Sequence, residues 1–120
     1  MTERTIYKIC TRAEWAAAES AGVYAGSALD LKDGFIHFSS AAQAASTAAK
    51  YFAGQGALLL IEVDGAPLGD AVKWEAAREG QIFPHLYAPL DVKAVSAVHD
   101  LPLDDEGRHV FPAHLGTQTP

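Results

Sequence analysis

Short apolar runs alternate along this chain with alanine-rich stretches that have helical spacing. The apolar runs are rich in β-branched and aromatic residues and are bounded by turn-forming residues, so they predict strands. These predicted strands cover residues 5–10, 35–39, 57–64 and 92–98. The run ALLLIEVD at 57–64 is apolar almost throughout, which is typical of a central strand buried on both faces. In the later segment FPHLY, Pro84 cannot donate a hydrogen bond to a strand ladder.

Two helices are predicted between the strands. Residues 11–14, TRAE, and residues 40–43, SAAQ, each have the residue types of a helix N-cap with a partner three positions later. Alanine-rich sequence follows both, and Gly22 and Gly54 are natural stops. The segment SALDLKDG at 27–34 is polar and ends in Asp-Gly, so it predicts a loop.

The order of these elements predicts an α+β fold in one domain. The helices come early and strands dominate later, without the strict strand–helix alternation of a doubly wound sheet, which favours a bent mixed or antiparallel sheet. A chain of 120 residues is also about one domain long. We assign residues 1–112 to the domain and expect 113–120 to be a frayed C-terminal tail.

Composition and charge exclude several classes of partner. The net charge is −6 and the nine basic residues are scattered, which argues against binding of bulk nucleic acid. The longest wholly apolar run, 57–61, is far shorter than the roughly 20 residues that span a bilayer, so we expect no membrane partner. The charged N-terminus lacks the apolar core of a signal peptide, and Cys10 is the single cysteine. A cytoplasmic location is expected.

The segment GFIHFSS at 34–40 is the first candidate for chemistry. Strand alternation puts His37 and Ser39 on the face opposite Ile36 and Phe38. The strand leads into a helix N-terminus, where free backbone N–H groups suit an anionic or phosphate-bearing ligand. A structural role explains the same residues, with Ser39 as a cap and His37 as a hydrogen-bonded, half-buried residue.

A second candidate combines FPHLY at 83–87 with KWE at 73–75. In an extended chain His85 and Tyr87 share a face, where aromatic rings could stack on a planar ligand; the alternative is a loop whose aromatics fill the core. Glu75 lies next to Trp74, and burial there would raise the pKa of its carboxyl group. Neither the HExxH spacing nor a Cys/His pair is present, so no metal site is predicted, and a zinc hydrolase would need ligands brought together only by folding.

These segments together resemble a small, mostly bacterial family of uncharacterised proteins, known as a domain of unknown function. The likeness extends from Ile6 to Pro112 and rests above all on GFIHFS and FPHLY. That family is similar in fold to the ADP-ribosyltransferase superfamily, a bent split sheet with small helices that holds NAD in a cleft. The resemblance therefore implies an ADP-ribosyltransferase-like fold and a nucleotide-like ligand, with NAD as a substrate and no further cofactor.

The resemblance also implies roles for individual residues. The run His37-Phe38-Ser39 is similar to the histidine–apolar–serine strand of the tRNA 2′-phosphotransferases. Lys8 stands where the classical ADP-ribosyltransferases carry an NAD-binding histidine. Transfer or cleavage at an N-glycosidic ribose bond is the implied reaction. A non-catalytic module for a small metabolite or a protein is the alternative, which Lys8 and the scarcity of arginines favour. The implied catalytic residues are His37, Glu75 and His85, and the implied ligand-binding residues are Lys8, Ser39 and Tyr87.

Overall fold

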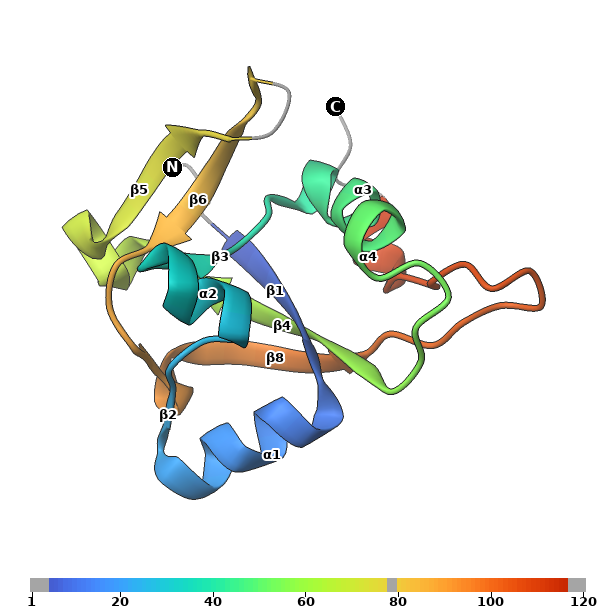
Figure 1. The fold of residues 1–120 in the computed structure, drawn as a ribbon, viewed down its shortest axis with the longest axis horizontal. Coiled ribbons are helices and arrows are strands. Elements are labelled where there is room, and N and C mark those ends of the chain that lie inside the picture. Colours follow the sequence, from blue (N-terminus) through green and yellow to red (C-terminus); the bar gives the residue numbers. More distant parts are fainter. Residues whose placement is uncertain (1–4, 78–79, 117–120) are drawn as a thin grey trace.

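Antiparallel strands form the centre of the computed structural model, which describes residues 5–77 and 80–116 (Figure 1). Its strands are β1 (Thr5–Thr11), β2 (Val23–Tyr24), β3 (Ile36–His37), β4 (Leu58–Asp64), β5 (Val72–Ala76), β6 (Ile82–Leu86), β7 (Leu90–Asp91) and β8 (Val95–Asp100). Its α-helices are α1 (Arg12–Ala21), α2 (Ala28–Asp33), α3 (Ala41–Tyr51) and α4 (Ala113–Gly116), and its 3-10 turns are η1 (Ala66–Ala71) and η3 (Val92–Ala94).

The strands form two three-stranded sheets and a two-stranded ribbon. The sheet orders are β1-β4-β8 and β3-β6-β5, the ribbon is β2-β7, and the paired strands in all three are antiparallel. Tyr7 of β1 exchanges two backbone hydrogen bonds of 2.8 Å with Ser39, which joins the two larger sheets. The radius of gyration is 13.6 Å, about the value expected for a compact chain of this length. The prediction of a single α+β domain with antiparallel strands is confirmed.

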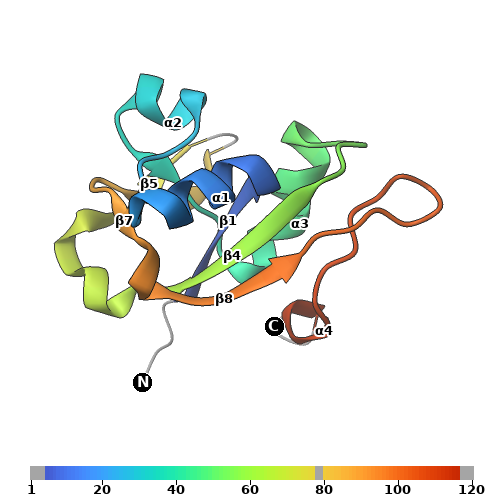
Figure 2. The same cartoon turned by 90° about the horizontal axis from the view of Figure 1, so that it is seen from below.

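Strand β4 lies in the middle of its sheet, as its apolar sequence predicts. Leu59, Ile61 and Val63 face a core that contains Trp15 and Ala18 of α1. Leu58 and Leu60, on the opposite face, belong to a second core beneath α3. Figure 2 shows β4 between β1 and β8, with α1 and α3 lying over different parts of the sheet. A strand with a core on each face has to be apolar at successive positions, which explains the uninterrupted run.

Capping at the first predicted helix is confirmed. The Thr11 hydroxyl accepts from the Glu14 backbone N–H at 3.0 Å, and the Glu14 carboxylate accepts from the Thr11 backbone N–H at 2.9 Å. Gly22 ends α1 with a φ of 87°, a left-handed conformation that glycine adopts without strain. Helix α3 begins after Ser40 as predicted and ends at Tyr51, slightly before Gly54.

The predicted loop at 27–34 is wrong, because residues 28–33 form α2. The Ser27 hydroxyl accepts from the Asp30 backbone N–H at 3.2 Å, and the Asp30 carboxylate accepts from the Ser27 backbone N–H at 2.9 Å. This capping box starts a helix that has no apolar stripe, so hydrophobic periodicity did not reveal it. Gly34 ends α2 with a φ of 88°.

Two other segments differ in detail from the prediction. Only Ile36–His37 of the expected strand 35–39 forms β3. Pro84 lies in β6, the middle strand of its sheet, and contributes only as an acceptor, because its carbonyl accepts from the Phe38 N–H at 3.0 Å. The strand pairing therefore continues past Pro84 although its nitrogen has no hydrogen to donate.

The C-terminal segment returns to the body of the protein after a projecting loop at 101–112 (Figures 1 and 2). We expected a frayed tail from residue 113, but α4 covers Ala113–Gly116 and Leu115 is buried in the second core. Residues 117–120 lie outside the described residues. No helix in the described part of the chain is long and apolar enough to cross a membrane.

Candidate functional site

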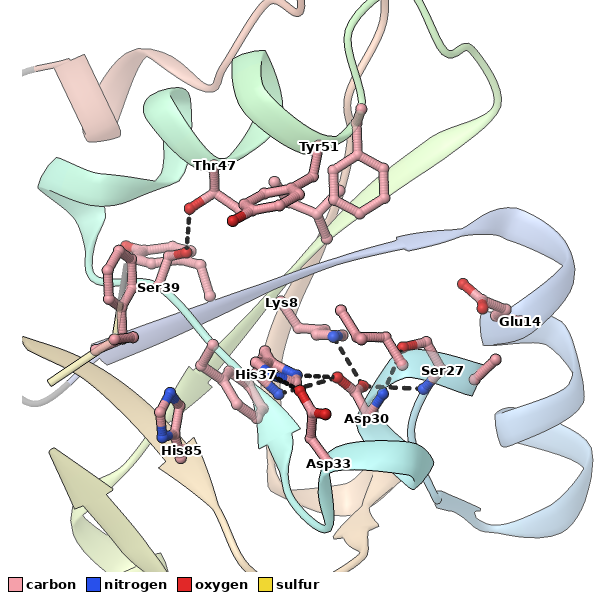
Figure 3. Close-up of a pocket in the computed structure, with 18 of the residues that line it drawn as sticks. Lys8, Glu14, Ser27, Asp30, Asp33, His37, Ser39, Thr47, Tyr51 and His85 are labelled. Atoms are coloured by element: carbon pink, nitrogen blue, oxygen red, sulfur yellow. Dashed lines mark hydrogen bonds and ion pairs between the residues drawn. The ribbon is translucent and has the colours of Figure 1, made fainter. Parts of the chain in front are cut away.

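A cavity of about 600 Å³ opens between β1, β6, α2 and α3. Figure 3 shows Thr47 and Tyr51 of α3 on one side of it and His37, Asp30 and Asp33 on the other. The polar residues that line it include Lys8, Thr11, Glu14, Ser27, Asp30, Asp33, His37, Ser39, Thr47, Gln55 and His85. Its aromatic residues are Tyr7, Phe38, Tyr51, Phe52 and Phe83.

Asp30 is the buried centre of the polar contacts in this cavity. It is 2% exposed, and its Oδ2 accepts from Lys8 Nζ at 2.8 Å and from the Ser27 backbone N–H at 2.9 Å. Its Oδ1 accepts from the His37 backbone N–H at 3.2 Å and lies 2.5 Å from His37 Nδ1. Burial is the largest influence and opposes ionisation, but the bonds from His37, Lys8 and Ser27 together outweigh it and hold the pKa of Asp30 well below its ordinary value.

Gly26 makes room for this carboxylate. It has a φ of +114°, and a Cβ atom built there would lie 2.7 Å from the Asp30 Cβ and 3.2 Å from Oδ2. Both the backbone conformation and the close approach therefore require glycine at this position.

His37 is held between two carboxylates. Its Nδ1 lies 2.5 Å from Asp30 and its Nε2 lies 3.0 Å from Asp33 Oδ2. Carboxylates are acceptors, so both bonds form when both ring nitrogens carry a proton and the imidazole is positively charged. Both ring nitrogens of His37 are therefore engaged by the chain's own carboxylates.

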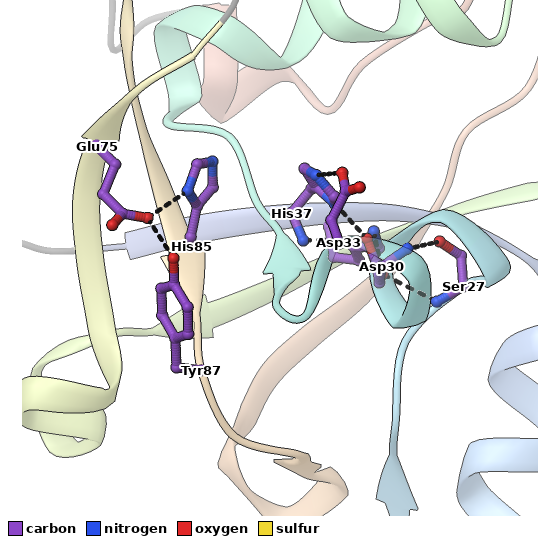
Figure 4. Close-up of polar contacts among 8 residues, drawn as sticks. Ser27, Asp30, Asp33, His37, Glu75, His85 and Tyr87 are labelled. Atoms are coloured by element: carbon purple, nitrogen blue, oxygen red, sulfur yellow. Dashed lines mark hydrogen bonds and ion pairs between the residues drawn. The ribbon is translucent and has the colours of Figure 1, made fainter.

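His85 is held on one side only. Its Nδ1 lies 2.7 Å from Glu75 Oε1, which also accepts from the Tyr87 hydroxyl at 2.8 Å (Figure 4). The hydrogen bond from His85, and then the one from Tyr87, lowers the pKa of Glu75, the opposite of the increase that burial beside Trp74 would cause. The bond to Glu75 raises the pKa of Tyr87. Nε2 of His85 remains as the ring nitrogen that Glu75 does not occupy.

The two histidines are neighbours across the β3–β6 pair. His37 and His85 are paired in register, and their ring centroids are 5.6 Å apart. Phe35 stacks on His85 with a centroid distance of 4.1 Å and an interplanar angle of 23°. One face of the His85 ring is therefore covered by the chain's own aromatic side chain.

The structure places the sequence-predicted residues in two groups. His37, His85, Lys8 and Ser39 line the cavity. Glu75 and Tyr87 are outside the lining. Glu75 is bonded to His85, which lines the cavity, and Tyr87 donates to Glu75. The Ser39 hydroxyl lies 2.8 Å from Thr47 Oγ1.

Sequence reasoning missed Asp30, Asp33 and Thr47. The spacing of Ser27 and Asp30 is that of a capping box and could have identified Asp30 as an ordered residue. Asp33 and Thr47 have no comparable local signal, because their site partners come from β3 or the segment that follows it. Within the described ranges, no group of three or more His, Cys, Asp or Glu side chains is arranged to hold a metal ion.

The sequence matches a known protein family. Residues 9–98 match the family described as "Protein of unknown function (DUF952)". The chain belongs to this family. Membership of DUF952 agrees with the predicted resemblance to a domain of unknown function.

Solved structures of one relative have the same fold as this DUF952 chain. The crystal structure of protein CC0527 from Caulobacter crescentus has a TM-score of 0.89 at 52% sequence identity, covering 94% of this chain and 99% of that one. The solution NMR structure of CC0527 has a TM-score of 0.85 at 52% identity, covering 95% and 98% of the two chains. A comparison with curated proteins finds no match for this chain.

Proposed function

We propose that the cavity binds NAD or a related nucleotide and that the protein transfers or cleaves the ligand at its N-glycosidic ribose bond, on a fold of the ADP-ribosyltransferase type. The observation that carries the proposal is His85 at the wall of the cavity, with Nδ1 bonded to Glu75 and Nε2 not engaged by it, beside His37, whose two nitrogens are bonded to Asp30 and Asp33. A histidine oriented by a carboxylate is a recurring arrangement for proton transfer. The unpaired Cys10 is consistent with a cytoplasmic location, which we also propose.

His85 is the acid–base group in this proposal. Glu75 accepts from Nδ1–H, so the neutral ring has its lone pair on Nε2. That nitrogen can take a proton from water or from an acceptor hydroxyl. Glu75 and Tyr87 position the ring and do not contact the ligand.

The carboxylates stabilise the positive charge that develops on the ribose. When the bond between the anomeric carbon and the base nitrogen breaks, the electron pair stays with the base and the sugar gains oxocarbenium character. The attacking oxygen then bonds to the anomeric carbon and its proton moves to His85 Nε2. Asp33 and Glu14 line the cavity, and fixed negative charge there favours this transition state.

Titration with NAD tests the proposal. We expect calorimetry and protein-observed NMR to detect binding at millimolar NAD or below, with shifts at cavity residues, and chromatography to detect release of nicotinamide. His85→Ala is expected to lower the turnover rate about 10²- to 10⁴-fold, because it removes the proton acceptor.

His99→Ala is the matched control, since His99 of β8 also pairs with a glutamate but does not line the cavity. Its turnover should equal that of the unmodified protein. The proposal is contradicted if neither NAD nor nicotinamide riboside binds at millimolar concentration.

A non-catalytic binding module is the second candidate. Two observations favour it: the Lys8 ammonium is engaged by Asp30, and Phe35 covers a face of His85. Ligand binding without turnover in the unmodified protein, and unchanged affinity in His85→Gln, would select this function over the catalytic one.

A further inference from the structure

The cavity has an excess of negative charge. Among the described residues that line it, Lys8 is the one lysine or arginine, and Glu14, Asp30 and Asp33 are carboxylates. The Lys8 side chain is 8% exposed and its ammonium is bonded to Asp30, so the pair is neutral. Two carboxylates remain, Glu14 and Asp33, and Asp33 Oδ2 lies 3.0 Å from His37 Nε2.

At the starts of α2 and α3, a backbone N–H group that could donate to a phosphate is already hydrogen-bonded to a side chain of the chain itself. The Ser27 backbone N–H at the start of α2 donates to the Asp30 carboxylate. The Ser40 backbone N–H at the start of α3 donates to Gln43 Oε1. Ser40 and Gln43 do not line the cavity. The chain's own acceptors therefore take these two donors, which are then not available to an anion.

The two arginines that the structure describes offer no replacement. Arg12 pairs with Asp100, and Arg108 pairs with Glu106 in the projecting loop. Neither lines the cavity, while Arg4 and Arg78 lie outside the described residues. No described guanidinium is thus positioned to neutralise a phosphate in the cavity.

The same surfaces suit a positively charged aromatic ligand. The Asp33 side chain is 37% exposed, so its carboxylate is accessible from solvent. Aromatic side chains, among them Tyr51, Phe52 and Phe83, line the cavity. Carboxylates together with aromatic faces attract a planar cation, through charge and through the ring quadrupole.

We infer that the cavity selects an N-riboside that has a positively charged planar base and no phosphate group. This inference rests on the proposed function and narrows its ligand from a nucleotide to a nucleoside, so NAD itself is expected to bind more weakly than nicotinamide riboside. The cationic base is also the better leaving group, because it departs as a neutral molecule when the glycosidic bond breaks. A phosphate on the ribose would bring negative charge close to Asp33 and Glu14.

Three related probes separate charge from phosphate. Nicotinamide riboside is cationic and has no phosphate, its 1,4-dihydro form has nearly the same shape without the charge, and nicotinamide mononucleotide adds a phosphate to the cation. We expect calorimetry at low ionic strength to show the riboside binding about tenfold or more tightly than either of the other two. Raising the salt concentration should narrow both differences.

Asp33→Asn tests the residue that carries the inference. We expect it to weaken riboside binding about threefold or more and to leave binding of the dihydro form nearly unchanged. Asp70→Asn removes the same charge from an exposed position outside the cavity, and it should change neither affinity.

Each alternative result has a distinct meaning. Equal or tighter binding of the mononucleotide overturns the exclusion of phosphate, and equal binding of the dihydro form overturns the selection of charge; the proposed function survives both. A fourth probe, 1-methylnicotinamide, has the cationic base without the ribose. If it binds as tightly as the riboside, the role of the ribose is overturned. If none of the probes binds and NAD also fails to bind at millimolar concentration, the proposed function itself is contradicted.

Discussion

At the scale of single residues, the ion pair of Lys8 and Asp30 explains how a lysine lies in an apolar strand. Lys8 shares the face of β1 that contains Ile6 and Cys10, and it is 7% exposed. A buried charge is tolerated only when a partner compensates it. The sequence predicted a ligand-binding role for Lys8, but its bond to Asp30 shows a structural contact that a strand pattern cannot reveal, because the partner comes from α2.

Asp30→Asn is expected to lower the free energy of unfolding by about 3–5 kcal/mol at pH 7, because it leaves the Lys8 ammonium buried without a countercharge. The loss should depend on pH. The pKa of Asp30 is lower in the folded protein than its ordinary value of 3.8, so the ionised carboxylate stabilises the fold above about pH 4 and this contribution declines as the pH falls further. Urea denaturation at pH 7 and pH 2.5 measures both effects.

Asp70→Asn is the control for this experiment, because Asp70 is exposed in η1. It should change the free energy of unfolding by no more than about 0.5 kcal/mol at either pH. A cost for Asp30→Asn that stays constant from pH 7 to pH 2.5 would contradict a lowered pKa for Asp30.

At the scale of elements, the sequence predicts those segments whose signals are local. Helix α1 has a capping box, an alanine-rich body and a terminal glycine, and β4 has its apolar run, so both agree with the prediction. Helix α2 was missed because polar contacts to its own N-terminus, rather than an apolar stripe, hold it in place. Since α2 carries Asp30 and Asp33, the missed helix supplies two of the three site residues that the sequence did not predict, and the third, Thr47, lies in α3.

Gly26→Ala should displace α2 and the site with it. The added methyl group would lie 2.7 Å from the Asp30 Cβ, and the φ of +114° is unfavourable for alanine. We expect the free energy of unfolding to fall by about 2–4 kcal/mol. Amide NMR signals around His37 should shift, because its backbone N–H bonds to Asp30.

Gly34→Ala separates the cost of the positive φ from the cost of the close approach to Asp30. Gly34 has a φ of +88°, but a Cβ atom there would have no atom within 4 Å, so only the backbone strain of about 1 kcal/mol is expected. Equal costs for the two variants would show that the approach of Gly26 to Asp30 does not constrain α2.

At the scale of the whole molecule, strand pairing assembles the candidate site. His37 and His85 come from distant parts of the sequence and become neighbours because β3 pairs with β6. The sequence identified both residues from their unusual apolar surroundings. It could not predict that His37 is bonded at both nitrogens and His85 at one by a glutamate, since those partners depend on how α2 and β5 pack against the two strands.

The second core also depends on contacts between distant parts of the sequence, because it includes Leu115 of α4, where the sequence predicted a frayed tail. Leu115 of α4 is 5% exposed and belongs to the cluster that contains Leu60 and Leu101. If this packing stabilises the fold, Leu115→Ala should lower the free energy of unfolding by about 2–4 kcal/mol, as measured by urea denaturation. Leu31→Ala is the control, because Leu31 is 66% exposed and its loss should cost no more than about 0.5 kcal/mol. A cost for Leu115→Ala as small as that of the control would mean that Leu115 does not contribute to the second core and that the packing of α4 does not stabilise the fold.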